Sequence, residues 1–283
     1  MNGSILVTGY GFIGKHLIEK LKQQSLDITV IDKSHMVISD KSLKVIPADL
    51  RYVKNLEFDY VFHLAGLANV SYQESNPLEA YEANVLSTVN LLREVKVRKK
   101  LLFTSSAAVY GTSDTRMIKE DEPLKPNSVY GETKVACENF IHMTALRHGL
   151  DYSIVRLFNT YGPQQSPMYI IPQFLKQLRE DNKIVVRNGS AVRDFIFIND
   201  VVDALLTVIE NDEKVVNVGT SYDAISMYEL AQKVVSVFHS DAEIVDLKRE
   251  DKSSPQRLVS NSAILRSLGW EPKYTLDQGL LLV

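Results

Sequence analysis

Tyr130 and Lys134 are the side chains in this 283-residue chain whose types and spacing point most directly to catalysis. They open a segment with helical periodicity, and a separation of four residues places both on one face of a helix. A free phenol titrates near ~10, too high for a base at neutral pH, and a neighbouring ammonium favours the phenolate. We therefore predict that Tyr130 is an acid/base for a carbinol and that Lys134 lowers its pKa. The same spacing occurs by chance on amphipathic helices, so the surrounding motifs decide.

A glycine-rich turn near the N-terminus indicates a dinucleotide site. Gly9, Gly11 and Gly14 follow a short apolar run and lead into helical periodicity. A strand, turn and helix of this kind bring free backbone amides close to a pyrophosphate. The next apolar run ends in Asp32, which is 18 residues past Gly14. An acid about 20 residues after the turn is expected to bind the adenosine ribose, so we predict this role for Asp32.

Strand-like and helix-like patterns alternate through the first half of the chain. The apolar runs after Asp32 cover residues 43–47, 60–64, 100–106 and 151–158. This alternation predicts an α/β fold with a doubly wound parallel sheet, whose ligand lies at the carboxyl ends of the strands.

Polar residues at the ends of these runs are candidates for the site. Asp49 could accept a hydrogen bond from an adenine amino group, although a turn acid explains it equally well. His63 is flanked by apolar residues, so we expect a buried, hydrogen-bonded histidine rather than a catalyst. Ser105 and Ser106 end the run 100–106, and a hydroxyl there could hydrogen-bond the substrate oxygen that Tyr130 protonates or deprotonates.

Composition excludes several functional classes. The 32 Lys and Arg residues against 35 Asp and Glu residues give a net charge of −3, with no long run of either sign, which argues against nucleic-acid and polybasic membrane surfaces. No apolar run approaches the ~20 residues of a membrane span, so we expect a cytoplasmic protein. The histidines show no metal-ligand spacing, so no metal is expected. The single Cys137 is expected to be a buried, inert thiol, and the basic cluster 96–100 to cap the C-terminus of a helix.

Short segments spread over nearly the whole chain occur in the order of a known family. They are residues 8–14 (TGYGFIG), 63–66 (HLAG), 84–85 (NV), 105–111 (SSAAVYG), Tyr130 with Lys134, 156–163 (RLFNTYGP) and 193–200 (RDFIFIND). Through them the chain resembles the extended short-chain dehydrogenase/reductase family, in its NAD-dependent nucleotide-sugar epimerase/dehydratase branch. The resemblance implies a Rossmann domain over residues 1–160, rejoined by about 195–220. A smaller C-terminal α/β lobe over 161–283 would mainly bind the nucleotide sugar.

The resemblance also implies a set of site residues. Ser106, Tyr130 and Lys134 would be catalytic, with Lys134 also bonding the nicotinamide ribose. The cofactor would be NAD, bound by Gly9, Gly11, Phe12, Ile13, Gly14, Asp32, Asp49, Leu50, Leu64, Ala65, Asn84, Ser105, Tyr130 and Lys134. Asn159 and Arg193 would bind the phosphates of the sugar nucleotide. Arg257 would be a second phosphate contact, with an exposed loop arginine as the alternative.

The chain departs from the family pattern at two places. Only Tyr10 separates Gly9 from Gly11, where this branch usually has two residues, so the glycine turn is one residue shorter. Ser260 stands where the family usually has an aspartate. The first departure bears on where the pyrophosphate would lie.

The predicted reaction depends on which carboxylates are present. Members of this branch begin alike, with a tyrosine removing a hydroxyl proton while a hydride passes to the nicotinamide. Dehydratases of the family follow the catalytic hydroxyl with an Asp-Glu pair, and related decarboxylases place a glutamate there. This chain has Ala107 and Ala108 instead. We therefore predict an epimerase that inverts C4 of a UDP-hexose or UDP-N-acetylhexosamine.

Two alternatives stay open at this point. One is a reductase of nucleotide 4-keto-6-deoxysugars that consumes NADPH; Asp32 argues against it because a carboxylate repels a 2′-phosphate, whereas Lys33 favours it. The other is a non-catalytic dinucleotide sensor, which would have no use for a paired tyrosine and lysine. Family habit further implies a homodimer through the helices that carry Asn84 and Tyr130.

Overall fold

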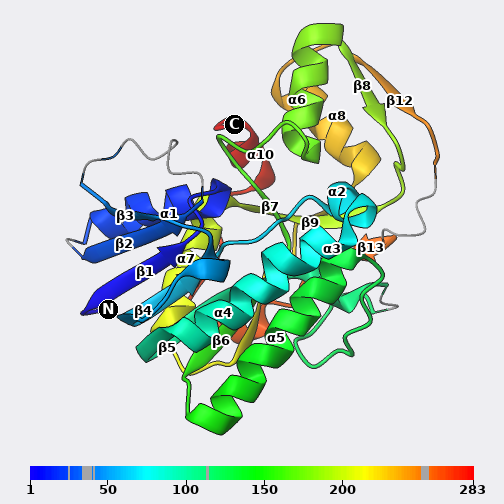
Figure 1. The fold of residues 1–283 in the computed structure, drawn as a ribbon. Coiled ribbons are helices and arrows are strands. Elements are labelled where there is room, and N and C mark those ends of the chain that lie inside the picture. The colour runs from blue at the N-terminus through cyan, green and yellow to red at the C-terminus, as the bar shows by residue number, and fades with distance from the viewer. Residues whose placement is uncertain (25, 34–39, 41, 113–114, 250–254) are drawn as a thin grey trace. The chain divides into compact units, whose positions relative to one another are not determined.

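A seven-stranded sheet is the largest element of the structure (Figure 1). The computed structural model describes residues 1–283 apart from 25, 34–39, 41, 113–114 and 250–254. The strand order is β10-β6-β5-β4-β1-β2-β3. The strands are β1 (Ser4–Thr8), β2 (Asp27–Asp32), β3 (Lys44–Pro47), β4 (Leu56–His63), β5 (Val95–Ser106), β6 (Tyr152–Leu157) and β10 (Val215–Val218). Parallel pairing of β1 with β2 and β4, of β2 with β3 and of β4 with β5 confirms the predicted doubly wound parallel sheet.

Helices connect these strands. They are α1 (Phe12–Lys22), α2 (Val70–Ser75), α3 (Pro77–Tyr81), α4 (Ser87–Glu94), α5 (Val129–His148) and α7 (Ile198–Ile209), with the short η2 (Leu50–Tyr52) and η4 (Ala107–Tyr110). Pro77 begins α3, because its fixed φ and missing amide suit the first helical position. Between α3 and α4 the chain continues as a π-helical turn, η3 (Glu82–Leu86), around the buried Asn84. Such π turns often mark functional positions, and no local sequence signal predicted this one.

Helix α5 has clear signals at both ends. The Ser128 side chain accepts a hydrogen bond from the Gly131 amide at 3.1 Å, which caps the N-terminus. Gly149 ends the helix in the left-handed conformation at φ 69°, where glycine carries no steric penalty. Helices α4 and α5 lie side by side (Figure 1).

The basic cluster 96–100, predicted to cap the C-terminus of a helix, does so through Lys100 but lies in a strand. Helix α4 ends at Glu94, and the cluster lies within β5, where Lys96 forms an ion pair with Glu57 of the neighbouring β4 at 2.9 Å. Lys100 is buried, and its ammonium donates to the Val208 carbonyl at the C-terminal end of α7 at 3.4 Å. A lysine of the cluster thus does meet helix C-terminal carbonyls, but those of a helix more than 100 residues later in the chain.

The chain forms two compact units. The first contains residues 1–111, 123–156 and 202–216, and the second contains 112–122, 157–201 and 217–283. The second unit has β7 (Asn159–Tyr161), β8 (Lys183–Val186), β9 (Val192–Phe197), β11 (Ala224–Ser226), β12 (Glu243–Asp246), β13 (Arg257–Leu258), α6 (Ile170–Asp181), α8 (Met227–Val237), α9 (Ala263–Ser267) and α10 (Leu276–Leu280). Strand β9 pairs with β7, β11 and β13, and β8 pairs with β12.

A buried carboxylate joins several segments of the second unit. Asp194 on β9 is fully buried and accepts hydrogen bonds from Thr220, Ser221 and Ser260. Ser260 contributes both its amide and its hydroxyl. The serine fits this position because an aspartate there would place a second carboxylate against Asp194.

Within the described residues, no helix combines the length and hydrophobicity needed to cross a membrane. The same residues contain no group of three or more His, Cys, Asp or Glu side chains arranged to hold a metal ion.

Candidate active site

Tyr130 and Ser106 are brought together by the close approach of α5 to η4. Ser106 ends β5, and its hydroxyl oxygen accepts from the Ala108 amide at 3.2 Å. A Cβ on Gly131 would lie 2.6 Å from the Ala108 carbonyl oxygen, so only glycine permits this contact. The first turn of α5 can therefore pack directly on η4, and the Ser106 hydroxyl lies near enough to the Tyr130 phenol to lower its pKa.

Lys134 lies one turn after Tyr130 and is buried. Its ammonium donates to the Thr104 carbonyl at 2.9 Å and lies 4.7 Å from the centre of the Phe103 ring and 5.9 Å from that of the Tyr130 ring. Burial lowers the pKa of Lys134, and the nearby Cys137 and Glu138 act in the opposite direction. The cation is thus held beside Tyr130 by the backbone of β5 and by aromatic faces.

The expected effect of Lys134 on Tyr130 needs correction. Burial raises the pKa of Tyr130, and the group that opposes this rise is the Ser106 hydroxyl, which favours the phenolate. The prediction that Lys134 lowers the Tyr130 pKa is wrong for this arrangement. The physical reason is that burial disfavours the charged phenolate and raises the pKa more than the neighbouring groups lower it.

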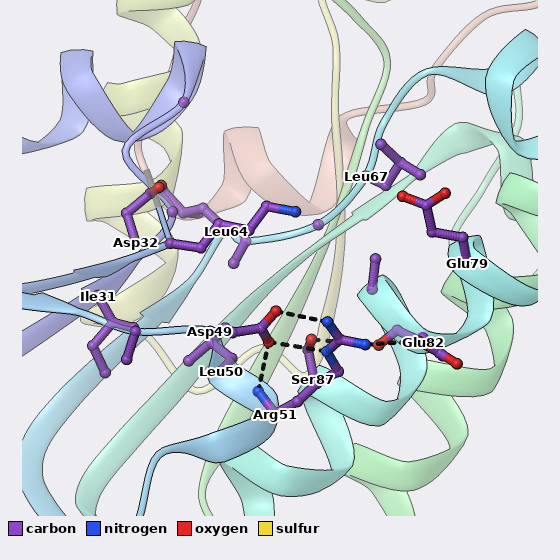
Figure 2. Close-up of a pocket in the computed structure, with 17 residues that line it drawn as sticks. Ile31, Asp32, Asp49, Leu50, Arg51, Leu64, Leu67, Glu79, Glu82 and Ser87 are labelled. Atoms are coloured by element: carbon purple, nitrogen blue, oxygen red, sulfur yellow. Dashed lines mark hydrogen bonds and ion pairs between the residues drawn. The ribbon is translucent and has the colours of Figure 1, made fainter. Parts of the chain in front are cut away.

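A pocket of about 340 Å³ opens at the carboxyl ends of β1, β2 and β4 (Figure 2). Its lining includes many of the residues predicted to bind the cofactor, namely Gly9, Gly11, Asp32, Asp49, Leu50, Leu64 and Ala65. It also includes Lys33, which favours the NADPH-dependent alternative, and Gly66 of the segment 63–66. The lining residues that the sequence did not single out for binding are Ile31, Ala48, Arg51, Leu67, Glu79, Glu82, Ala83 and Ser87. The remaining predicted cofactor residues, which are not part of this lining, are Phe12, Ile13, Gly14, Asn84, Ser105, Tyr130 and Lys134.

Close contacts require glycine at two positions of the short turn, and the third glycine faces open space. Gly9 adopts φ +90°, and a Cβ there would lie 2.9 Å from the Ala65 backbone. A Cβ on Gly14 would lie 2.0 Å from the Gly9 carbonyl oxygen. At Gly11 a Cβ would meet no atom within 4 Å, so the backbone faces open space in the pocket wall. This open glycine cradle fits the pyrophosphate of a dinucleotide.

Asp32 braces the turn. Its carboxylate accepts from the Tyr10 amide at 2.7 Å. Asp32 lines the pocket (Figure 2), as does the next residue, Lys33. The single residue between Gly9 and Gly11 is thus tied to the acid that is predicted to bind the ribose. The shorter turn is compatible with the pocket that a dinucleotide requires.

Asp49 has the structural role that was the alternative in its prediction. Its carboxylate accepts from the Arg51 amide at 2.9 Å and forms an ion pair with the Arg51 guanidinium at 2.9 Å. Arg51 also binds Glu82 at 2.7 Å, so the guanidinium bridges η2 and η3 along the pocket (Figure 2). The bond with Arg51 lowers the pKa of Asp49. The adenine contact of Asp49 stays a prediction.

Gly66 connects the pocket to the catalytic side chains. It lines the pocket, and a Cβ there would lie 3.0 Å from the Asn84 amide oxygen and 3.6 Å from the Lys134 nitrogen. Asn84 accepts from the Leu67 amide at 2.7 Å and donates to Thr133 at 2.9 Å. Asn84 therefore fixes the backbone of the pocket wall at Leu67. Gly66 is the lining residue that lies next to the Lys134 ammonium.

Two titratable side chains behave as expected. His63 is fully buried between the Thr8 hydroxyl at 2.8 Å and the Thr88 hydroxyl at 2.9 Å. Burial and the charge of Lys134 lower its pKa to about 3, so the predicted neutral, satisfied histidine is confirmed. Cys137 is buried, as predicted, and burial raises the pKa of its thiol.

The predicted phosphate ligands gather around β9 of the second unit. Asn159 pairs with Phe195 of β9, and Arg257 pairs with Val192, the residue before Arg193. The Arg257 side chain donates to the Arg116 carbonyl at 3.0 Å. Strand pairing thus brings these three residues into one small sheet, and their binding roles stay predictions.

Ser105 faces a different set of groups from Ser106, the next residue in the chain. Its hydroxyl is buried and donates to Glu138 on α5 at 2.5 Å. Glu138 forms a buried ion pair with Arg156 at 2.7 Å. Sequence reasoning gave Glu138 no role and placed Arg156 only within a family motif. The signal in the sequence was Glu138 itself, a charged residue among the apolar positions of the Tyr130 helix, which indicates a buried, paired charge.

Comparisons with known proteins agree with this geometry. Residues 5–219 match the model of the NAD dependent epimerase/dehydratase family. The chain is 31% identical to UDP-glucuronic acid decarboxylase 6 of Arabidopsis thaliana, over 100% of this chain and 88% of that protein.

Solved structures are similar over nearly the whole chain. UDP-glucose 4-epimerase of Thermotoga maritima with UDP-glucose has a TM-score of 0.89 at 27% identity, covering 99% of this chain and 96% of that one. UDP-glucose 4-epimerase of Thermus thermophilus in complex with NAD has a TM-score of 0.87 at 25% identity, covering 99% and 97%. With its glycine cradle, its pocket and its Tyr130 and Lys134 pair, the chain belongs to the NAD-dependent epimerase/dehydratase family and uses NAD as its cofactor.

Proposed function

We propose that the protein is a nucleotide-sugar 4-epimerase that acts on a UDP-hexose or UDP-N-acetylhexosamine. The observation that supports this most strongly is the Ser106 and Tyr130 pair, placed beside Lys134 and next to the Gly66 wall of the dinucleotide pocket. A similar protein of known structure is a UDP-glucose 4-epimerase with UDP-glucose bound.

Each residue of the set has a distinct task. Tyr130 takes the proton of the C4 hydroxyl and later returns it from the same oxygen. The Ser106 hydroxyl favours the phenolate of Tyr130 and holds the sugar oxygen. Lys134 keeps a positive charge beside the phenol and is predicted to bond the nicotinamide ribose. When bound, NAD would accept the hydride from C4 and, in its reduced form, return it to the same carbon.

The residues that follow Ser106 favour epimerisation over elimination or decarboxylation. Ala107 is buried, and the Ala108 carbonyl packs against Gly131. Neither position offers the carboxylate that the family's dehydratases and decarboxylases are expected to place there. The site offers a keto-sugar no acid or base for elimination or decarboxylation at these positions. Return of the hydride to C4 is therefore the favoured outcome.

A keto-sugar reductase is the second candidate, and the observation in its favour is Lys33 in the pocket lining. A lysine beside the adenosine ribose could meet the 2′-phosphate of NADPH. Asp32 lines the same pocket, and its carboxylate opposes that phosphate. We therefore rank the reductase below the epimerase.

Asn159, Arg193 and Arg257 are the residues proposed to bind the diphosphate of the sugar nucleotide. A guanidinium presents parallel donors to phosphate oxygens, and an amide adds a neutral donor. Arg193 and Arg257 come from paired strands, which suits two contacts to one diphosphate.

A homodimer is proposed as the assembly. Exposed apolar side chains concentrate on the helical segment 77–94 and on α5, including Leu78 at 81% exposure and Leu146 at 74%. Large exposed apolar side chains grouped on neighbouring helices are typical of protein interfaces. A second copy of the chain would cover them in a symmetric four-helix contact.

The function is tested with purified protein and a panel of nucleotide sugars, without added reductant. The panel contains UDP-glucose, UDP-galactose, UDP-N-acetylglucosamine and UDP-glucuronic acid, and the products are separated and identified. We expect interconversion of at least one hydroxyl sugar with its C4 epimer, and no interconversion by Tyr130→Phe. Release of CO₂ from UDP-glucuronic acid would instead indicate a decarboxylase. Stoichiometric oxidation of added NADPH by a 4-keto-sugar, without interconversion, would indicate the reductase.

A further inference from the structure

A buried polar network surrounds the catalytic end of β5 and has no place in the mechanism so far. Its members are Ser105, Tyr110, Glu138 and Arg156, each at most 5% exposed. The Arg156 guanidinium binds the Glu138 carboxylate through two nitrogens, at 2.7 and 3.1 Å. A third nitrogen donates to the Tyr110 hydroxyl at 2.9 Å. The Ser105 hydroxyl donates to Glu138 at 2.5 Å.

The network holds the chain on both sides of Ser106. Ser105 is the residue before Ser106, and Tyr110 ends the η4 turn that begins immediately after it. Both are tied to the Glu138 and Arg156 pair, which is itself anchored on α5 and β6. The segment that carries the Ser106 hydroxyl is therefore fixed at two points by one ion pair.

Helix α5 meets three successive residues of β5 through side chains on one face. Lys134 bonds the Thr104 carbonyl at 2.9 Å, and Glu138 bonds the Ser105 hydroxyl. Tyr130 lies next to Ser106, whose hydroxyl lowers the Tyr130 pKa. Positions 130, 134 and 138 are spaced by four, so they lie one above the other. The contact made by Glu138 is thus in line with the two contacts made by the predicted catalytic residues.

We propose that Glu138 and Arg156, acting through Ser105 and Tyr110, are positioning residues that set the distance between the Ser106 hydroxyl and the Tyr130 phenol. A buried ion pair is weak evidence for stability, because apolar replacements of similar volume are often neutral or stabilising. Positioning explains why the chain keeps buried charges here, since small displacements of reacting groups cost large factors in rate. The inference rests on the proposed catalytic role of Tyr130, which the related decarboxylation and dehydration would share.

Ser105→Ala is the variant that tests this proposal. It removes the link between Glu138 and the strand without substituting Ser106, Tyr130 or Lys134. Ser105→Thr keeps a hydroxyl and serves as the conservative rescue. Ser153→Ala is the matched control, because the Ser153 hydroxyl is also fully buried in this sheet and donates to the Glu213 carbonyl, outside the predicted catalytic set.

The kinetic readout separates positioning from a loss of stability. For Ser105→Ala we expect kcat to fall on the order of tenfold, KM for the nucleotide sugar to stay within about twofold, and the rising limb of the pH profile to move to higher pH. Ser105→Thr should recover most of kcat, and Ser153→Ala should match the parent. A Ser105→Ala enzyme with parental kcat and pH profile, or one whose kinetic change equals that of Ser153→Ala, would overturn the proposal.

A second readout does not depend on turnover. With tyrosine labelled at the ring carbon that bears the hydroxyl, the Tyr130 resonance is identified by its absence from Tyr130→Phe. It should shift in Ser105→Ala, return toward the parental position in Ser105→Thr and stay unchanged in Ser153→Ala. An unchanged resonance in Ser105→Ala contradicts positioning. If no nucleotide sugar is turned over by the parent, the proposed function fails, and this resonance still decides the role of the network.

Discussion

At the scale of single residues, the Tyr130 phenol is the group proposed to carry the chemistry, and its surroundings shift its pKa. Burial raises its pKa, and the Ser106 hydroxyl opposes that rise. Tyr130→Phe removes one oxygen and should leave the fold and NAD binding intact. We expect turnover to fall on the order of 10²- to 10⁴-fold, the usual contribution of a general acid/base. A steady-state rate within a factor of two of the parent would remove Tyr130 from this role.

His63 gives a residue-scale prediction about stability and pH. Its pKa is lowered to about 3, whereas the unfolded chain takes up a proton near ~6.5. Between these values the unfolded state binds the extra proton, so the stability is present above pH ~6.5 and is lost as the pH falls. We expect the free energy of unfolding to drop by roughly 3 kcal/mol from this group between pH 6.5 and 4. Denaturant titrations over that range should show a steeper fall for the parent than for His63→Gln, and equal slopes would contradict the assignment.

At the scale of elements, the contact between the start of α5 and η4 places Tyr130. Gly131→Ala would push a Cβ to within 2.6 Å of the Ala108 carbonyl oxygen. We expect a loss of about 1–3 kcal/mol in stability and a larger loss of kcat than that stability change explains, because the displaced turn carries Tyr130.

Gly149→Ala is the control at the other end of α5. Gly149 has φ +69° and no steric neighbour within 4 Å, so alanine there should cost only the roughly 1 kcal/mol of left-handed strain. Chemical denaturation and steady-state kinetics distinguish the two variants. Equal kcat in Gly131→Ala and the parent would show that the close contact does not position Tyr130.

The elements also show which features a sequence can predict. The parallel sheet, the glycine turn and the start of the Pro77 helix were predictable because strand runs, glycine spacing and a helix-starting proline are local signals. The partners of Lys100 and Glu138 were not, because the choice of partner depends on packing between distant segments. The raised pKa of Tyr130 was missed for the same reason, since it follows from burial and not from the spacing of Tyr130 and Lys134.

At the scale of the whole molecule, the exposed apolar side chains of α5 predict self-association. Phe140, Met143 and Leu146 are 39%, 49% and 74% exposed. Light scattering at micromolar concentration should give twice the 31.9 kDa of one chain.

The double variant Phe140→Glu with Leu146→Glu should give the mass of one chain, because charge opposes burial of this face. Leu281→Glu, at a residue that is 65% exposed elsewhere in the chain, should keep the parental mass. A parent with the mass of one chain would contradict the homodimer.

The central claim is that the hydride removed from C4 returns to the same carbon. The most direct test uses a UDP-hexose labelled with deuterium at C4, incubated with the purified protein without added reductant, and follows the product by mass spectrometry and NMR. We predict formation of the C4 epimer with the deuterium retained at C4 and no net change in the absorbance of reduced nicotinamide. An epimer that has lost the deuterium, or net consumption of reduced cofactor without any epimer, would contradict it.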